Sequence, residues 1–332
     1  MPFYIIRDDI TKVKVDAIVN AANRQLQEGG GVCGAIFESA GRQQLTEACQ
    51  LVAPIKTGEA ILTPGYQLPA AFIIHTAGPK WSGGHNDEES LLRASYQNSL
   101  ELASRHQLKS VAFPLISSGI YGFPKKQAFK IARDVIGKYV ETHEMTVYLV
   151  LLDQNAITVS EELKIAIEQF IDEEAVHHLE QRYSRSHANV REEGTFSFKE
   201  LPDIHEEKRS TLDQFLTNAE ETFSQKLLRL NDERQLSDPE VYKRANLDRR
   251  LFSKIRSNKD YQPKKATALA LALALELSLE ETQDLLSAAG YSLSKSTKFD
   301  LIVEYFIRQQ NYDIYLVNEV LFTYHQPPLG TF

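Results

Sequence analysis

Two glycine-rich segments are the parts of this 332-residue sequence best suited to bind a ligand, at residues 29–31 (GGG) and 117–122 (SSGIYG). Each follows an apolar run typical of a buried strand and precedes a run typical of a helix. Glycine lets the backbone approach a ligand closely, and the free N–H groups at the start of a helix favour anions. Together, the two loops predict a site for a long, phosphorylated ligand.

Polar side chains stand beside these loops. Asn20 and Asn23 belong to the run NAAN before the first loop, and Asp9 follows the first expected strand. A side-chain amide can both donate to and accept from a neutral ribose, whereas a diphosphate favours several oriented N–H donors. An alternative for both asparagines is a purely structural role, because Asn is common in turns.

The first 171 residues alternate strand-like and helix-like runs. Strands are expected at residues 4–7, 17–20, 60–63, 72–76, 111–115 and 147–152, and helices at 34–41, 42–51, 88–106, 125–142 and 160–170. Continuous apolar strands such as VYLVLL suit a sheet that is covered on both faces, which predicts a three-layer α/β/α domain. Ligands of such sheets lie at the carboxyl ends of strands, where both loops fall.

This part of the sequence resembles a macrodomain, the module that binds ADP-ribose. The resemblance rests on VDAIVNAAN at 15–23, GGGV at 29–32, the run from Gly58 to Pro79 and PLISSGIYGFP at 114–124. It extends from about residue 2 to about residue 171. It implies an α/β fold with a mixed sheet, and a pocket for ADP-ribose or a mono-ADP-ribosylated protein.

The resemblance also implies roles for matching residues. Asp9 would accept a hydrogen bond from the adenine amino group, beside the backbone of Ile10. Asn20 would stabilise the first loop, and Asn23 would bind the distal ribose as the catalytic residue. The residues expected to wrap that ribose and one phosphate are Gly29, Gly30, Gly31, Val32 and Cys33. Those expected to wrap the diphosphate are Ser117, Ser118, Gly119, Ile120, Tyr121 and Gly122, with Phe123 against the distal ribose.

Two positions depart from the hydrolytic members, which commonly read GGGVDGAIH. Cys33 replaces the Asp and Phe37 replaces the His, so the carboxylate that would position or activate a water is missing. Hydrolysis of mono-ADP-ribose from proteins, or of a related ester, would then need the ligand's own phosphate to orient the water. A non-catalytic reader is the alternative. For Cys33 a small residue beside the ribose is favoured over an activated thiol, and His75 is expected to be structural.

The remainder of the chain is expected to be an acidic linker over 172–209, or a weakly ordered helix there, followed by an all-helical domain over 210–332. The linker histidines His177, His178 and His187 are expected to be solvated. Helices are expected at 239–246, 248–256, 264–277, 279–289, 298–309 and 312–324.

Residues 223–290 resemble a helix-turn-helix domain of the phage-repressor type. The motif would span 238–258, with Asn246 in a left-handed turn and LDRRLFSKIRSN as the recognition helix. Its exposed basic residues would be Arg249, Arg250, Lys254 and Arg256, which suit phosphates and guanine edges. The acidic segments on either side oppose DNA binding, so a protein-contact or dimerising role is the alternative.

Composition bounds the remaining choices. The sequence has no apolar run of the ~20 residues that a membrane span needs, and its start lacks a signal-peptide pattern. Two cysteines are too few for a disulfide framework or a CxxC metal site. A cytoplasmic protein is therefore expected, with no metal, no cofactor and no membrane partner.

Overall fold

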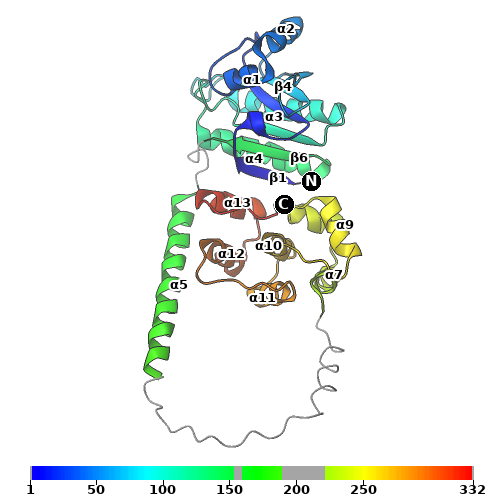
Figure 1. The fold of residues 1–332 in the computed structure, drawn as a ribbon. Coiled ribbons are helices and arrows are strands. Elements are labelled where there is room, and N and C mark those ends of the chain that lie inside the picture. Colours follow the sequence, from blue (N-terminus) through cyan, green and yellow to red (C-terminus); the bar gives the residue numbers. More distant parts are fainter. Residues whose placement is uncertain (1, 153–158, 189–220, 331–332) are drawn as a thin grey trace, which may run out of the picture.

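The computed structural model describes residues 2–152, 159–188 and 221–330, which form a sheet-containing half and a helical half (Figure 1). The strands are β1 (Phe3–Arg7), β2 (Ala17–Ala22), β3 (Ala60–Pro64), β4 (Phe72–Ala77), β5 (Ser110–Pro114) and β6 (Thr146–Leu151). Their order across the sheet is β1-β6-β5-β2-β4-β3. All neighbouring pairs are parallel except β3 and β4, so the sheet is mixed as predicted.

Helices cover both faces of this sheet. They are α1 (Val32–Ala40) and α2 (Arg42–Val52) on one face, and α3 (Glu88–Arg105) and α4 (Lys125–Thr142) on the other. Consecutive residues of a strand point to opposite faces. Ile18 accordingly joins the core that contains Phe37 of α1, whereas Val19 joins the core that contains Tyr96 of α3. The sheet is buried on both sides, which confirms the three-layer prediction.

In the other half, the described residues 161–188 and 223–323 are helical, with short connecting segments within 223–323. Its helices are α5 (Glu161–Ala188), α7 (Phe223–Glu233), α8 (Asp238–Arg244), α9 (Arg249–Ser257), α10 (Lys265–Ala274), α11 (Leu279–Ala288), α12 (Lys298–Arg308) and α13 (Ile314–Thr323). Helix α10 lies in the middle of the group, and its residues 267–274 are all buried (Figure 1). The alternating Ala and Leu of this helix therefore supply the centre of the helical core. Among the described residues, no helix is long and apolar enough to cross a membrane.

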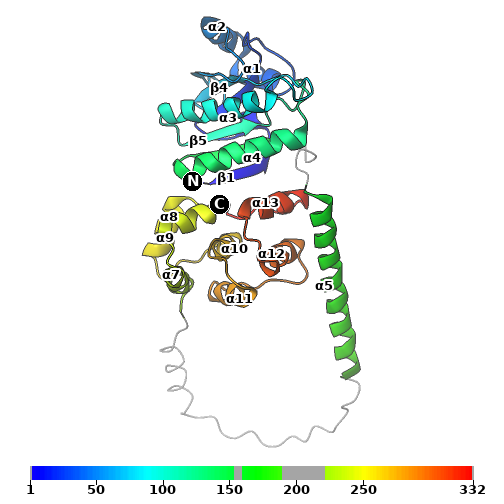
Figure 2. The same ribbon diagram turned by 180° about the vertical axis from the view of Figure 1, so that it is seen from behind.

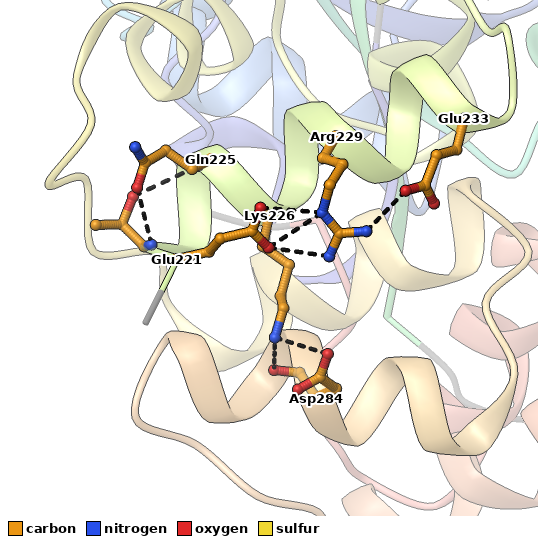
Figure 3. A network of polar contacts seen from close by, with 7 residues as sticks. Glu221, Gln225, Lys226, Arg229, Glu233 and Asp284 are labelled. Carbon is orange, nitrogen blue, oxygen red and sulfur yellow. Dashed lines mark hydrogen bonds and ion pairs between the residues drawn. The ribbon is translucent and has the colours of Figure 1, made fainter. Parts of the chain in front are cut away.

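Charged side chains stabilise α7 and join it to α11 (Figure 3). Arg229 of α7 binds Glu221 through two nitrogens and Glu233 through a third. One turn earlier, Lys226 lies 2.6 Å from a carboxylate oxygen of Asp284, on α11. Reciprocal capping boxes start α7, α8 and α11, so local sequence determines where these helices begin.

Helix α5 changes the expected organisation. It runs without a break from Glu161 to Ala188, so residues 172–188 follow the helical alternative rather than the linker. Ile167 is fully buried in the helical core, and Glu174 forms ion pairs with Lys295 and Arg308. The packing thus joins α5 to the helical half, although the sequence places a boundary after residue 171. Residues 189–209 of the expected linker lie outside the described residues.

The two halves meet along β1, the edge strand of the sheet. In both views α13 lies next to β1, and the two chain ends lie between the halves (Figure 1, Figure 2). Asn246, between α8 and α9, accepts a hydrogen bond from Phe3 N–H at 2.6 Å and donates to Phe3 O at 2.8 Å. Tyr4 donates to the carbonyl of Gly330, and Arg133 of α4 pairs with the buried Glu319 of α13.

Candidate functional site

Asn20, near the end of β2, begins a chain of buried polar side chains beneath the first loop. Its Nδ2 lies 3.1 Å from Nδ1 of His75 on β4 and donates to Cys33 Sγ at 3.7 Å. Nε2 of His75 lies 2.9 Å from Thr63 Oγ1. Complete burial lowers the pKa of His75 to about 4, so the imidazole is neutral at pH 7. His75 thus passes a hydrogen bond from Asn20 to Thr63, in agreement with the structural role expected for it.

Asn23 folds back onto the first loop. Its Nδ2 donates to Gln27 O at 2.8 Å, and its Oδ1 accepts from Gln27 N–H at 3.1 Å. The side chain is only half-buried, so it lies at the surface of the loop. The amide here makes the turn-forming contacts that the sequence allowed as an alternative to a ribose contact. A ribose at Asn23 would have to compete with Gln27.

Cys33 lies in the first turn of α1 and is 6 % exposed. Burial is the main cause that raises the pKa of its thiol. The thiol is therefore protonated at neutral pH, which contradicts the activated-nucleophile alternative. Phe37, one turn further along α1, is 1 % exposed and packs into the core. Neither residue supplies the charge or the imidazole that the hydrolytic pattern has at these positions.

The first loop folds tightly against the start of α1. A Cβ on Gly34 would lie 2.7 Å from the carbonyl oxygen of Gly29, so only glycine fits at position 34. Residues 29–31 are exposed, whereas Val32 is half-buried. The loop therefore presents its glycine backbone outward.

The second loop is closed by its own hydrogen bonds. Gly122 N–H donates to Gly119 O at 2.9 Å, and Phe123 N–H donates to Ser117 O at 3.0 Å. Ser118 Oγ donates to Leu115 O. Ser117 is buried at φ 64°, and its Oγ has no partner among the residues that the structure describes. These bonds hold the loop in a fixed shape.

The two loops lie side by side, because β2 and β5 are neighbouring parallel strands whose carboxyl ends lie at the same end of the sheet. A Cβ on Gly30 would lie 3.1 Å from Cδ1 of Ile120. Ile120 is 79 % exposed, an unusual position for a large apolar side chain. The structure thus brings the two predicted glycine loops into direct contact.

Asp9 follows β1 at the same carboxyl end of the sheet and caps the short helix η1 (Ile10–Lys12). Its Oδ1 accepts from the Thr11 hydroxyl at 2.7 Å and from Thr11 N–H at 3.0 Å. The Thr11 hydroxyl is the main cause that lowers the pKa of Asp9. Asp9 is therefore a charged acceptor at neutral pH, while the side chain of Ile10 is buried and leaves only its backbone for a ligand.

Phe123, expected against the distal ribose, packs in the core of the structure. It is 2 % exposed, and its ring lies 4.6 Å from the ring of Trp81, centroid to centroid. Trp81 has no role among the site residues expected from the sequence, yet it contacts this part of the site. The backbone N–H of Trp81 donates to the carbonyl of Tyr121, in the second loop, at 2.8 Å. The available signal was a single tryptophan between GPK and SGG.

The proposed DNA-binding face is largely engaged within the chain. Asn246 adopts φ 53°, which confirms the predicted left-handed turn. Arg249 lies 3.4 Å from Glu144 of the sheet-containing half, and Arg256 pairs with Asp238. Lys254 lies over the ring of Tyr261. The remaining basic residue of the set, Arg250, is exposed.

The sequence matches the Macro domain family over residues 19–132. It is 48% identical over 154 residues to a macro domain-containing protein of Methanosarcina mazei, covering 46% of this chain and 82% of that relative. It is 51% identical over 136 residues to O-acetyl-ADP-ribose deacetylase 1 of Pantoea vagans, covering 40% and 79%. A solved Oceanobacillus iheyensis macrodomain with ADP is 42% identical, covering 50% of this chain and 91% of that chain, with a TM-score of 0.45. The chain therefore belongs to the macro domain family.

Proposed function

We propose that the sheet-containing half binds ADP-ribose or an ADP-ribosyl derivative at its two glycine loops. The observation that carries this proposal is the direct contact of the loops, with Gly30 beneath Ile120, at the carboxyl ends of β2 and β5. Their backbone N–H groups suit the diphosphate, which needs oriented donors more than it needs cations. Asp9, at the carboxyl end of β1, supplies a charged acceptor for an adenine amino group.

The bound derivative would be hydrolysed at an ester of the distal ribose, either mono-ADP-ribose on a modified protein or a small ADP-ribose ester. A relative named O-acetyl-ADP-ribose deacetylase supports this reaction class. In the reaction, Asn23 would leave Gln27 and hold the distal ribose. The attacking water would be oriented by a phosphate oxygen of the ligand, because the protonated thiol of Cys33 is a poor general base.

A non-catalytic reader is the second candidate, and one specific observation favours it. The two positions that carry Asp and His in the hydrolytic pattern hold a buried neutral thiol, Cys33, and a buried phenyl ring, Phe37. Neither group stores or moves a proton at neutral pH. The same loops would then sense ADP-ribose, or a protein modified with it, without releasing it.

Calorimetric titration of the full chain with ADP-ribose tests the binding step. AMP, which lacks the second phosphate and the distal ribose, serves as the control ligand. The same protein is then incubated with O-acetyl-ADP-ribose and with a protein that is mono-ADP-ribosylated on acidic residues. Binding with release makes the protein a hydrolase, and binding without release makes it a reader. No binding of ADP-ribose would refute both.

For the helical half we infer an internal docking role rather than duplex binding. Arg249 and Arg256 form surface ion pairs with Glu144 and Asp238, and these carboxylates would lie close to any phosphate bound there. The DNA alternative predicts that Arg249→Ala combined with Arg250→Ala abolishes duplex binding, and that binding weakens as salt rises. A gel-shift titration at low salt decides, because salt-sensitive binding by the wild-type chain would overturn the docking interpretation.

A further inference from the structure

A loop next to the second glycine loop is organised around one buried carboxylate. Glu88, the first residue of α3, is 2 % exposed. Its Oε1 accepts from Ser82 N–H at 3.0 Å, from Ser82 Oγ at 2.7 Å and from Gly84 N–H at 3.2 Å. Its Oε2 accepts from Asn86 N–H at 2.6 Å. Four donors from residues 82–86 thus converge on a single side chain.

This loop holds Trp81 against the second glycine loop. Trp81 precedes Ser82 directly, and a Cβ on Gly84 would lie 3.0 Å from the Trp81 ring, so the loop closes over the indole. On its other side, the indole packs against Phe123 at 4.6 Å. The Trp81 backbone N–H donates to Tyr121 O at 2.8 Å. Trp81 therefore contacts the residues on both sides of Gly122.

From this chain of contacts we propose that Glu88 is a positioning residue for the loop of residues 117–122, acting through Trp81. Glu88 gathers the donors of residues 82–86, the gathered loop presses Trp81 into place, and Trp81 fixes the carbonyl of Tyr121 and the ring of Phe123. The N–H groups of residues 117–122 are thereby held in one arrangement before a ligand arrives. The consequence for ADP-ribose affinity rests on the proposed function, whereas the coupling of Glu88 to the loop does not.

The carboxylate suits this task better than a neutral group of the same shape. Both oxygens of Glu88 accept hydrogen bonds, and such bonds are stronger when the acceptor is charged. In Glu88→Gln one oxygen becomes an NH2 group, which can only donate. It would then face an N–H donor of Gly84, Ser82 or Asn86, and that part of the loop would be released.

The experiment compares wild type, Glu88→Gln and Glu89→Gln as full-length, ligand-free proteins. Glu89 is the matched control, because it is the next residue, is exposed and pairs with Arg93 on the same helix. Hydrogen exchange is measured for residues 117–123, and acrylamide quenching for Trp81, the single tryptophan of the sequence. We expect about tenfold faster exchange of the Phe123 amide and stronger quenching in Glu88→Gln alone. Exchange over residues 110–114 of β5 should not change, which separates a local effect from general destabilisation.

ADP-ribose titration of the same three proteins adds the functional arm. Affinity should fall about tenfold in Glu88→Gln and stay unchanged in Glu89→Gln, because disordered donors bind a diphosphate less well. Wild-type exchange and quenching in Glu88→Gln would overturn the proposal. If the wild-type chain fails to bind ADP-ribose, the proposed function fails, and the exchange measurement still decides the coupling.

A milder variant covers the case in which Glu88→Gln does not fold. Ser82→Ala removes a single hydroxyl donor to Glu88 and leaves the backbone donors in place. It should shift exchange and quenching in the same direction by a smaller factor. No shift in either measurement would refute the positioning role.

Discussion

The backbone is exposed to solvent in the first loop at the carboxyl end of the sheet, whereas at the β1 edge it is hydrogen-bonded and buried. At the carboxyl end, residues 29–31 and Ile120 are exposed, and the buried side chains of Asn20 and His75 lie beneath the first loop. At the β1 edge, the side chain of Asn246 bonds both the N–H and the C=O of Phe3, as a neighbouring strand would. One region leaves the glycines of its first loop exposed, and the other removes strand backbone groups from solvent.

The difference agrees with the binding role proposed for the loops. Open N–H groups on a fixed loop can bind an anion without rearranging, whereas an open strand edge is a hazard because another chain can pair with it. Asn246 therefore protects the edge of the sheet while it also forms the left-handed turn between α8 and α9. The turn between α8 and α9, where the sequence predicted a helix-turn-helix, thus contacts the sheet-containing half.

The largest effect is expected from breaking the closed edge. Asn246→Gly keeps a residue suited to φ 53° but leaves two buried backbone groups of Phe3 unpaired, at a cost of about 4 kcal/mol. Gln310→Gly, at φ 52° on an exposed residue, is the control and should not destabilise the protein. Urea unfolding measures both. ADP-ribose affinity should persist in Asn246→Gly at low denaturant, and its loss would show that the two regions are not independent.

Acid should weaken the buried support of the open loops. The pKa of His75 is lowered to about 4 in the folded protein, so between pH 6.5 and 4 the unfolded state binds the extra proton. Stability is then complete above pH 6.5 and falls as the pH drops, by about 3 kcal/mol at pH 4. Urea unfolding followed by Trp81 fluorescence should show this loss in wild type and in His106→Gln, an exposed control. His75→Gln should lack it, and an equal loss in His75→Gln would contradict the assignment.

Asn23→Ala tests the open loop itself. It removes both contacts to Gln27 and the proposed ribose contact, so hydrolysis of an ADP-ribose ester should fall about 100-fold, equivalent to about 2.7 kcal/mol. Gln27→Ala alters the same turn without touching the amide of Asn23, because only the backbone of Gln27 is used. It should retain activity. Unchanged turnover in Asn23→Ala would refute the catalytic role.

The smallest expected effect comes from restoring the missing carboxylate. Cys33→Asp places a charged acceptor in the first turn of α1, where a water could be positioned, and should raise hydrolysis about tenfold. Cys33→Ser has a similar size without the charge and is the matched control. Equal rates in the two variants would show that the thiol does not limit the natural protein.

Much of the fold and of the site follows from local sequence. The predicted bounds of the six strands agree with those of β1–β6 to within one or two residues. Apolar runs bounded by glycine and asparagine are local signals, so they also mark the two loops. The left-handed turn at Asn246 is also a local prediction, and φ is 53° there. These features need no knowledge of distant residues.

Tertiary structure decided the contacts between segments that are far apart. The pairing of Asn246 with Phe3 joins residues 243 positions apart, and no local pattern marks it. The same holds for the burial of Phe123 against Trp81, for Glu88 as the centre of its loop, and for the packing of α5 on the helical core. Sequence by itself determined which backbone segments bend and which are apolar. Only the packed structure determined which polar groups pair with each other, because the pairing depends on which segments are packed together.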